Sequence, residues 1–241
     1  MSRFLKYGWV NFFKLLALKK LRVKQVKLSL RDGHDPLALY GNSMDYRLFS
    51  DIFLYDAYGM TLRSEPMYIL DCGANIGIST RYFINRYPRA KIAAVEPDRR
   101  NFEILQSNVR GCDVKTYQMA LHNKKETLRL TNDALSSYSR RFEQDGHGSQ
   151  EIMAVPLQDL FLELQWPRID VLKMDIEGGE NAVFDTQDPW LSRVNAFVIE
   201  FHEYLKDGGT QAILSKIFST GQYRIQAFGE HVLIERLQWI S

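Results

Sequence analysis

Cysteine is scarce in this sequence, and long apolar runs are missing. Its two cysteines among 241 residues, Cys72 and Cys112, cannot form a disulfide framework, so we expect a reducing cytoplasmic location. The apolar run near the N-terminus is interrupted by Lys14 and is followed by no small-residue cleavage site, which argues against a signal peptide. No run reaches the ~20 apolar residues of a membrane span. Neither a Cys/His zinc pattern nor a G-x-S-x-G motif occurs.

Acidic residues are absent from the first 31 positions, where nine basic residues occur. The chain has 31 Lys and Arg against 29 Asp and Glu, so without those nine it has 22 basic against 29 acidic residues. Because the basic charge is confined to one segment, we expect no nucleic-acid partner. Residues 4–21 form a predicted helix with apolar residues on one side and lysines on the other. Peripheral contact with the inner face of an anionic membrane and packing on the domain both remain open.

Strand and helix patterns alternate from Met67 onward. The strands are nearly continuous apolar runs, which is typical of a parallel sheet covered by helices on both faces. Residues 1–66 are expected to form the basic helix and a strand/helix extension, and residues 67–241 the main domain. We predict strands at 68–73, 91–97, 114–121, 169–175 and 196–202, and helices at 76–87 and 98–109.

The C-terminal stretch "YRIQAFGEHVLIERL" departs from this alternation. It contains two strand-like runs joined by a turn at Gly229, too short for a helical crossover, so the two strands must be antiparallel. A mostly parallel seven-stranded sheet that ends in an antiparallel hairpin is the class I methyltransferase variant of the Rossmann-like α/β fold. We predict that fold. Dinucleotide-dependent dehydrogenases would normally lack the antiparallel hairpin.

The stretch "ILDCGANIGIST" places a glycine-rich loop directly after the first predicted strand. Asn75 occupies the place of the middle glycine of a G-x-G-x-x-G fingerprint, so the loop suits a ligand without phosphates. The amino-acid end of S-adenosylmethionine is such a ligand, and Asp71 would face its ammonium directly or through water. Glu96 ends the second strand, where an acidic side chain can hold both ribose hydroxyls. We therefore predict S-adenosylmethionine as the cofactor.

The stretches "VLKMDIEGGE" and "FVIEFHEY", together with the glycine loop and "VEP", resemble the FkbM family of S-adenosylmethionine-dependent methyltransferases. That family's K-x-D-x-E-G-x-E segment is matched by Lys173, Asp175, Glu177, Gly178 and Glu180. The resemblance implies O-methylation of a hydroxyl, often on a sugar of a glycan, a glycolipid or a glycosylated natural product. A lipid or small aglycone acceptor, and a non-catalytic partner of glycan-assembly enzymes, remain as alternatives. We assign the cofactor site to Asp71, Gly73, Asn75, Gly77, Glu96, Ala120 and Asp175.

Lys173 and Glu200 interrupt two apolar strands that should be buried. An unpaired buried ammonium is very unfavourable, so we predict that the two residues lie level on adjacent strands and form a buried ion pair. A catalytic role for Lys173 is the alternative.

The catalytic candidates lie at the C-terminal ends of two predicted strands, and they are Asp175, Glu177 and His202. They could hold a divalent cation, or His202 could act as a general base oriented by a carboxylate. The metal-free base is preferred here. The other histidines show no partner spacing and are expected to be solvated: His34, His122, His147 and His231.

Overall fold

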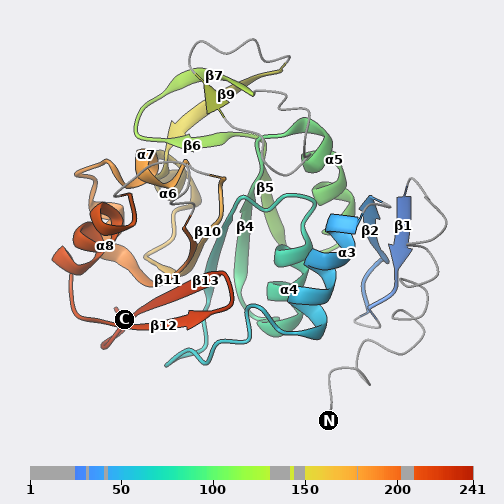
Figure 1. Cartoon of the computed structure of the whole chain (residues 1–241), viewed down its shortest axis with the longest axis horizontal. Coiled ribbons are helices and arrows are strands. Elements are labelled where there is room, and N and C mark those ends of the chain that lie inside the picture. The colour runs from blue at the N-terminus through green and yellow to red at the C-terminus, as the bar shows by residue number, and fades with distance from the viewer. Residues whose placement is uncertain are drawn as a thin grey trace.

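A seven-stranded sheet forms the centre of the molecule, with strand order β12-β13-β11-β10-β3-β4-β5 (Figure 1). The structure is a computed structural model that describes residues 25–30, 33–40, 43–130, 142–143, 150–177, 179–201 and 209–240. The strands are β3 (Tyr68–Cys72), β4 (Lys91–Val95), β5 (Val114–Tyr117), β10 (Ile169–Met174), β11 (Val194–Glu200), β12 (Tyr223–Phe228) and β13 (His231–Arg236).

The inner strands are apolar because both of their faces are covered. In β10 all six residues are buried, and successive side chains point to opposite faces. On one face the strands pack against α4 (Ile78–Arg86) and α5 (Arg99–Asn108). On the other face they pack against α6 (Leu157–Leu164), α7 (Glu180–Phe184) and α8 (Gly209–Ser219). The predicted parallel sheet with helices on both faces is confirmed.

The C-terminal hairpin is antiparallel, as its short turn predicted. β13 pairs antiparallel with β12 on one side and with β11 on the other, whereas β11, β10, β3, β4 and β5 are mutually parallel. Gly229 in the hairpin turn has φ of 57°, a left-handed conformation that favours glycine. The predicted class I methyltransferase topology is therefore observed.

The strand predicted at 114–121 is divided in two. β5 ends at Tyr117, and β6 (Ala120–His122) joins a second, four-stranded sheet of order β6-β9-β7-β8. Its other strands are β7 (Glu126–Leu130), β8 (Phe142–Glu143) and β9 (Gln150–Pro156). The apolar pattern runs through the break because both parts are partly buried, so the pattern alone could not reveal the change of sheet.

The extension before the domain packs onto the main core. β1 (Gln25–Leu28) and β2 (Leu37–Tyr40) form an antiparallel pair, and α3 (Ser43–Phe49) continues into a π-helical turn, η1 (Ser50–Leu54). Their apolar side chains share one core with α4 and the sheet. Asn108 at the end of α5 hydrogen-bonds to both backbone groups of Ala38 in β2. The helix predicted at 4–21 lies outside the described residues, and within the described part no helix is long and apolar enough to cross a membrane.

Candidate functional site

A pocket opens at the carboxyl ends of β3, β4 and β10, the edge where open α/β sheets bind ligands. Its volume of about 260 Å³ is near the lower end of the roughly 300–1,000 Å³ usual for small-molecule sites. The walls come from the glycine loop after β3, from the residues that follow β4 and β10, and from α3 and η1. The pocket is thus built jointly by the domain and its extension.

The glycine loop is held in an uncommon backbone conformation. Gly73, Asn75 and Gly77 all have positive φ, of 76°, 50° and 84°. A side chain at Gly73 is impossible without a shift of the backbone, because its Cβ would lie 1.7 Å from the carbonyl oxygen of Asp175. The amides of Gly73 and Ala74 both donate to the carbonyl of Val95, which fixes the loop on β4. Glycine is therefore required at Gly73 by packing as well as by φ.

Glu96 lines the pocket directly after β4. Its Oε2 accepts a hydrogen bond from the amide of Asn75 at 2.9 Å, and its Oε1 one from the amide of Asp98 at 2.9 Å. Only 6% of the residue is exposed, and this burial raises its pKa to about 8 although the Asn75 amide opposes the rise. The side chain of Asn101 also hydrogen-bonds to this carboxylate. A carboxylate has about four lone-pair sites, so Glu96 retains capacity to accept a further hydroxyl donor.

Asp71 lies beneath the glycine loop, and its side chain does not line the pocket. The residue is fully buried, and its Oδ2 accepts hydrogen bonds from the hydroxyls of Ser79 and Thr80 at 2.8 and 2.7 Å. Direct contact with a ligand ammonium does not fit this arrangement, and contact through water stays a prediction. Asp71 instead ties the start of α4 to the end of β3.

Lys173 is buried beside Asp71, and the predicted pairing with Glu200 is wrong in its register. Lys173 lies level with Asp71 on β3 and with Val198 on β11, two residues short of Glu200. Its Nζ lies 3.4 Å from Asp71 Oδ1 and 3.5 Å from Asp175 Oδ2, and it donates to the Gly73 carbonyl at 2.7 Å. Burial lowers the pKa of Lys173, but the carboxylates of Asp175 and Asp71 raise it well above its ordinary value, so the ammonium stays charged. The predicted buried ion pair exists with different partners.

Further lining residues come from the segment where the chain passes from β5 to β6. They are Met119, Ala120 and Leu121. Asp98 also lines the pocket, and it caps α5 by accepting the Asn101 amide at 2.9 Å. Ala120, predicted from the sequence as a cofactor contact, is thus part of the pocket wall.

The catalytic candidates are only partly covered by the structure. Asp175 and Glu177 line the pocket, and Glu177 has a left-handed φ of 56°. His202 lies outside the described residues, so its role stays a prediction. His231 was expected to be solvated, but only 9% of it is exposed and its Nε2 lies 3.5 Å from Glu200 Oε2. The pairing of β11 with β13 places His231 beside Glu200, and the spacing of the two residues along the chain does not predict it.

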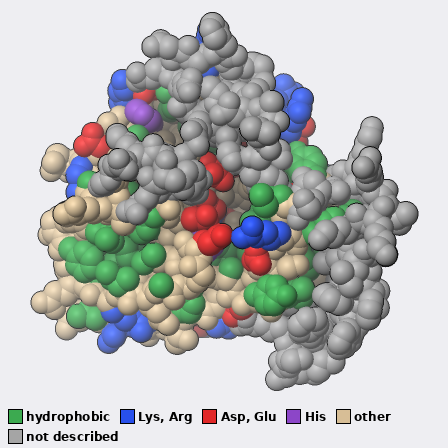
Figure 2. Space-filling model, in the orientation of Figure 1, with side chains coloured by type: hydrophobic (Ala, Val, Ile, Leu, Met, Phe, Trp, Pro, Cys, Tyr) green, Lys and Arg blue, Asp and Glu red, His purple; other side chains and the backbone are tan. Residues whose placement is uncertain are grey.

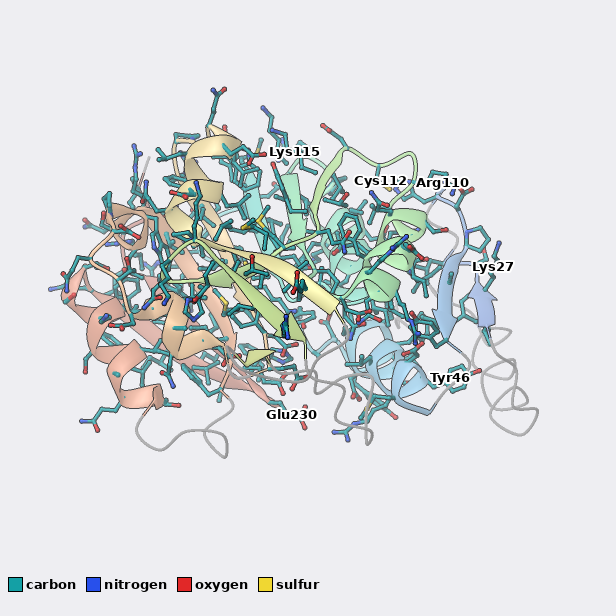
Figure 3. All side chains as sticks on the ribbon, turned by 90° about the horizontal axis from the view of Figure 1, so that it is seen from above. Lys27, Tyr46, Arg110, Cys112, Lys115 and Glu230 are labelled. Carbon is teal, nitrogen blue, oxygen red and sulfur yellow. The ribbon has the colours of Figure 1, made fainter. Side chains whose placement is uncertain are left out.

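The mouth of the pocket is acidic. Asp51, Glu177, Glu200 and Glu230 line it, and Figure 2 shows Asp and Glu side chains gathered in the middle of this face beside Lys or Arg. Arg47 bridges Asp51 at 3.4 Å and Glu230 at 3.1 Å. Figure 3 shows Glu230 at the same edge as Tyr46 of α3, opposite Lys115 and Cys112. The hairpin and the extension therefore meet at the pocket mouth.

A sequence model described as the Methyltransferase FkbM domain matches residues 71–231, more than half of the chain. The chain belongs to the FkbM methyltransferase family. The resemblance seen in the sequence is thereby confirmed. In the family segment after β10, Glu180 is 4% exposed, and its carboxylate accepts a hydrogen bond from the Ile176 amide at 3.2 Å. Glu180 therefore stabilises the turn between β10 and α7, and it is not among the pocket-lining residues.

Individual relatives of this FkbM-family chain are distant. "Methyltransferase 1" of Beauveria bassiana is 24% identical over 218 residues, covering 80% of this chain and 83% of that protein. "Methyltransferase sdnD" of Sordaria araneosa is 27% identical over 176 residues, covering 58% of this chain and 68% of that protein. The crystal structure of Methyltransferase FkbM from Methylobacillus flagellatus KT superposes with a TM-score of 0.53 at 18% identity, covering 80% of this chain and half of that one. The superposition shows the fold, and the family match shows a methyltransferase.

Tyr58 is a pocket residue that sequence reasoning missed. It is 3% exposed, lines the pocket, and lies after η1 in the extension. Burial raises the pKa of its hydroxyl, so the group remains a protonated phenol at neutral pH. No motif marks this tyrosine, because its position depends on how the extension folds back over α4.

Proposed function

We propose that this FkbM-family methyltransferase uses S-adenosylmethionine to methylate a hydroxyl group, on a sugar of a glycan, a glycolipid or a glycosylated natural product. The observation that carries the proposal is Glu96, a pocket carboxylate held by the amides of Asn75 and Asp98 directly beside the glycine loop. A carboxylate at the end of this strand suits the two hydroxyls of a ribose.

The described residues fit this cofactor. Glu96 would accept the ribose hydroxyls, and the apolar residues Met119, Ala120 and Leu121 offer a wall for the adenine. Gly73 lets the glycine loop pack directly against the backbone of Asp175, because glycine has no side chain to separate the two. The loop lacks the close glycines that a pyrophosphate requires, which favours a ligand without phosphates.

The chain's own task in the reaction is to align the acceptor and remove its proton. The sulfonium of S-adenosylmethionine supplies an activated methyl group when the cofactor is bound. Lys173 holds the Gly73 carbonyl and the Asp175 carboxylate in fixed positions, which keeps the pocket floor rigid. Asp175, Glu177 and Glu200 offer carboxylates on the acceptor side of the pocket, where a hydroxyl proton could be accepted.

Two alternatives use the same pocket. A lipid or small aglycone could present the hydroxyl, and a non-catalytic role as a cofactor-binding partner of glycan-assembly enzymes would need no acceptor. The polar, acidic pocket mouth favours a polar acceptor such as a sugar over an acyl chain. The intact pocket carboxylates argue against loss of catalysis.

Formation of S-adenosylhomocysteine tests this proposal. The purified full chain is incubated with S-adenosylmethionine and, separately, with free sugars, glycolipids and apolar alcohols, and the product is measured by mass spectrometry. We expect product with a sugar-bearing acceptor, together with a gain of one methyl group on its oxygen. Product only with apolar alcohols would contradict the sugar assignment, and methylation of nitrogen would contradict O-methylation.

A further inference from the structure

Three potential metal ligands converge where β10, β11 and β13 meet. Asp175 follows the last residue of β10, Glu200 is the last residue of β11, and His231 is the first residue of β13. One carboxylate oxygen of each acid and one imidazole nitrogen all lie within 4.8 Å of one another. The sheet topology explains this: β10 and β11 end at one edge, and the antiparallel β13 begins at that edge, with His231 level with Glu200.

The imidazole of His231 is held inside the protein. Nine tenths of the residue is buried, and the Tyr58 ring packs edge-on against it with centroids 4.7 Å apart. Its Nε2 points to Glu200, at 3.5 Å from Oε2. A buried histidine fixed among carboxylates differs from an exposed acidic cluster, because the imidazole is preorganised to present one nitrogen.

We infer that Asp175, Glu200 and His231 bind a divalent metal ion of the Mn²⁺ type. Two carboxylate oxygens and one imidazole nitrogen suit a first-row divalent ion better than Mg²⁺, which prefers oxygen ligands alone. Asp175 and Glu200 line the pocket, so the metal ion would lie at the pocket wall. Three ligands leave open positions of an octahedral set for water or for an acceptor oxygen. Its role rests on the proposed function: a metal-bound hydroxyl loses its proton more readily.

The neighbouring charges are compatible with this site. The Lys173 ammonium lies 3.5 Å from Asp175 Oδ2, but a carboxylate has a second oxygen and about four lone-pair sites in all. Among the described lining residues, the pocket mouth also carries Asp51, Glu177 and Glu230 beside the guanidinium of Arg47. This ligand set differs from the one suggested by the sequence, since Glu200 and His231 take the places of Glu177 and His202.

Titration of the full chain with Mn²⁺, followed by the electron paramagnetic resonance signal of the free ion, tests the inference. We expect one Mn²⁺ per chain in the wild type. Glu200→Gln removes the negative charge of one ligand and His231→Ala removes the imidazole ligand, so each should weaken Mn²⁺ binding at least about tenfold. Glu230→Gln is the matched control, because Glu230 lines the same pocket but is not part of the cluster, and its affinity should equal that of the wild type.

Absence of Mn²⁺ binding in the wild type would overturn the inference. Equal weakening in Glu230→Gln would also overturn it, because the ion would then be attracted by the acidic mouth as a whole. Should His231→Ala fail to fold by circular dichroism, the partly exposed Glu200→Gln decides alone. Calorimetry with S-adenosylhomocysteine on the same preparations separates the two proposals. Cofactor binding without Mn²⁺ binding removes the metal site and leaves the proposed function standing.

Discussion

Replacing Lys173 by methionine should strongly destabilise the protein. Lys173 is 1% exposed, and the substitution removes the cation that faces two carboxylates while leaving a side chain of similar length. The Asp71 side chain is fully buried, so its charge would lose its counter-ion without gaining water. The Asp175 side chain is 25% exposed and can be solvated in part, so Asp71 accounts for most of the expected loss.

Removing one partner of a buried ion pair costs about 3–5 kcal/mol of unfolding free energy, and we expect Lys173→Met to fall in that range. Equilibrium urea unfolding followed by circular dichroism measures the loss. Lys115→Met is the matched control, because Lys115 is an exposed lysine of β5, and it should change the unfolding free energy by no more than about 0.5 kcal/mol. Adding Asp71→Asn to Lys173→Met should recover part of the loss, since the unpaired charge is then removed. A loss below about 1 kcal/mol, the value of an exposed pair, would refute the argument.

Three further predictions concern the pocket, the extension and the N-terminal segment. Burial raises the Glu96 pKa to about 8, so S-adenosylhomocysteine should bind more tightly as the pH rises from 6 through about 8, because the ionised carboxylate is the better acceptor for hydroxyls. Calorimetry should show that Glu96→Gln removes this pH dependence, and a pH-independent wild type would contradict the assignment. Asn108→Ala should lower the unfolding free energy by about 2–3 kcal/mol, because the backbone groups of Ala38 and the Ile76 carbonyl lose buried hydrogen bonds. Urea unfolding measures this loss. A loss of less than about 0.5 kcal/mol would show that Asn108 does not hold β2 in place. If the basic N-terminal segment contacts a membrane, the full chain should float with anionic vesicles but not with neutral ones. The double substitution Lys19→Glu and Lys20→Glu should then abolish flotation. If neither protein floats with anionic vesicles, packing of the segment on the domain is the remaining alternative.

The fold could be predicted because its elements are set by local patterns. Continuous apolar runs identified β3, β4, β10 and β11, and the short turn at Gly229 required an antiparallel hairpin. Where local patterns are ambiguous the prediction failed. Residues 114–121 read as one strand, although the chain leaves one sheet after Tyr117 and enters another at Ala120.

The position of the glycine loop and Glu96 in the pocket was predictable for a related reason. Gly73, Asn75 and Glu96 line the pocket, and Gly77 belongs to the same loop without being a lining residue. All four follow two strands closely in sequence, so placing the strands also placed them. The positions of Asp175 and Glu200 in the pocket depend on pairing between distant segments. The observed β10–β11 register differs by two residues from the predicted one, so Glu200 does not lie level with Lys173. The β11–β13 pairing places Glu200 level with His231. Spacing along the chain contains no information on such a register.

The affinity of the full chain for S-adenosylhomocysteine, measured by calorimetry in the wild type and in Glu96→Ala, tests the central claim most directly. At a pH above 8, where the Glu96 carboxyl is ionised, the wild type should bind in the micromolar range. Glu96→Ala should then lose on the order of 1.5–3 kcal/mol, or about 10- to 150-fold in affinity, because the ribose hydroxyls lose a charged acceptor. Glu103→Ala, on the exposed side of α5, should bind like the wild type. Unchanged affinity in Glu96→Ala, or no binding by the wild type, would contradict the assignment of this pocket to the methyl donor.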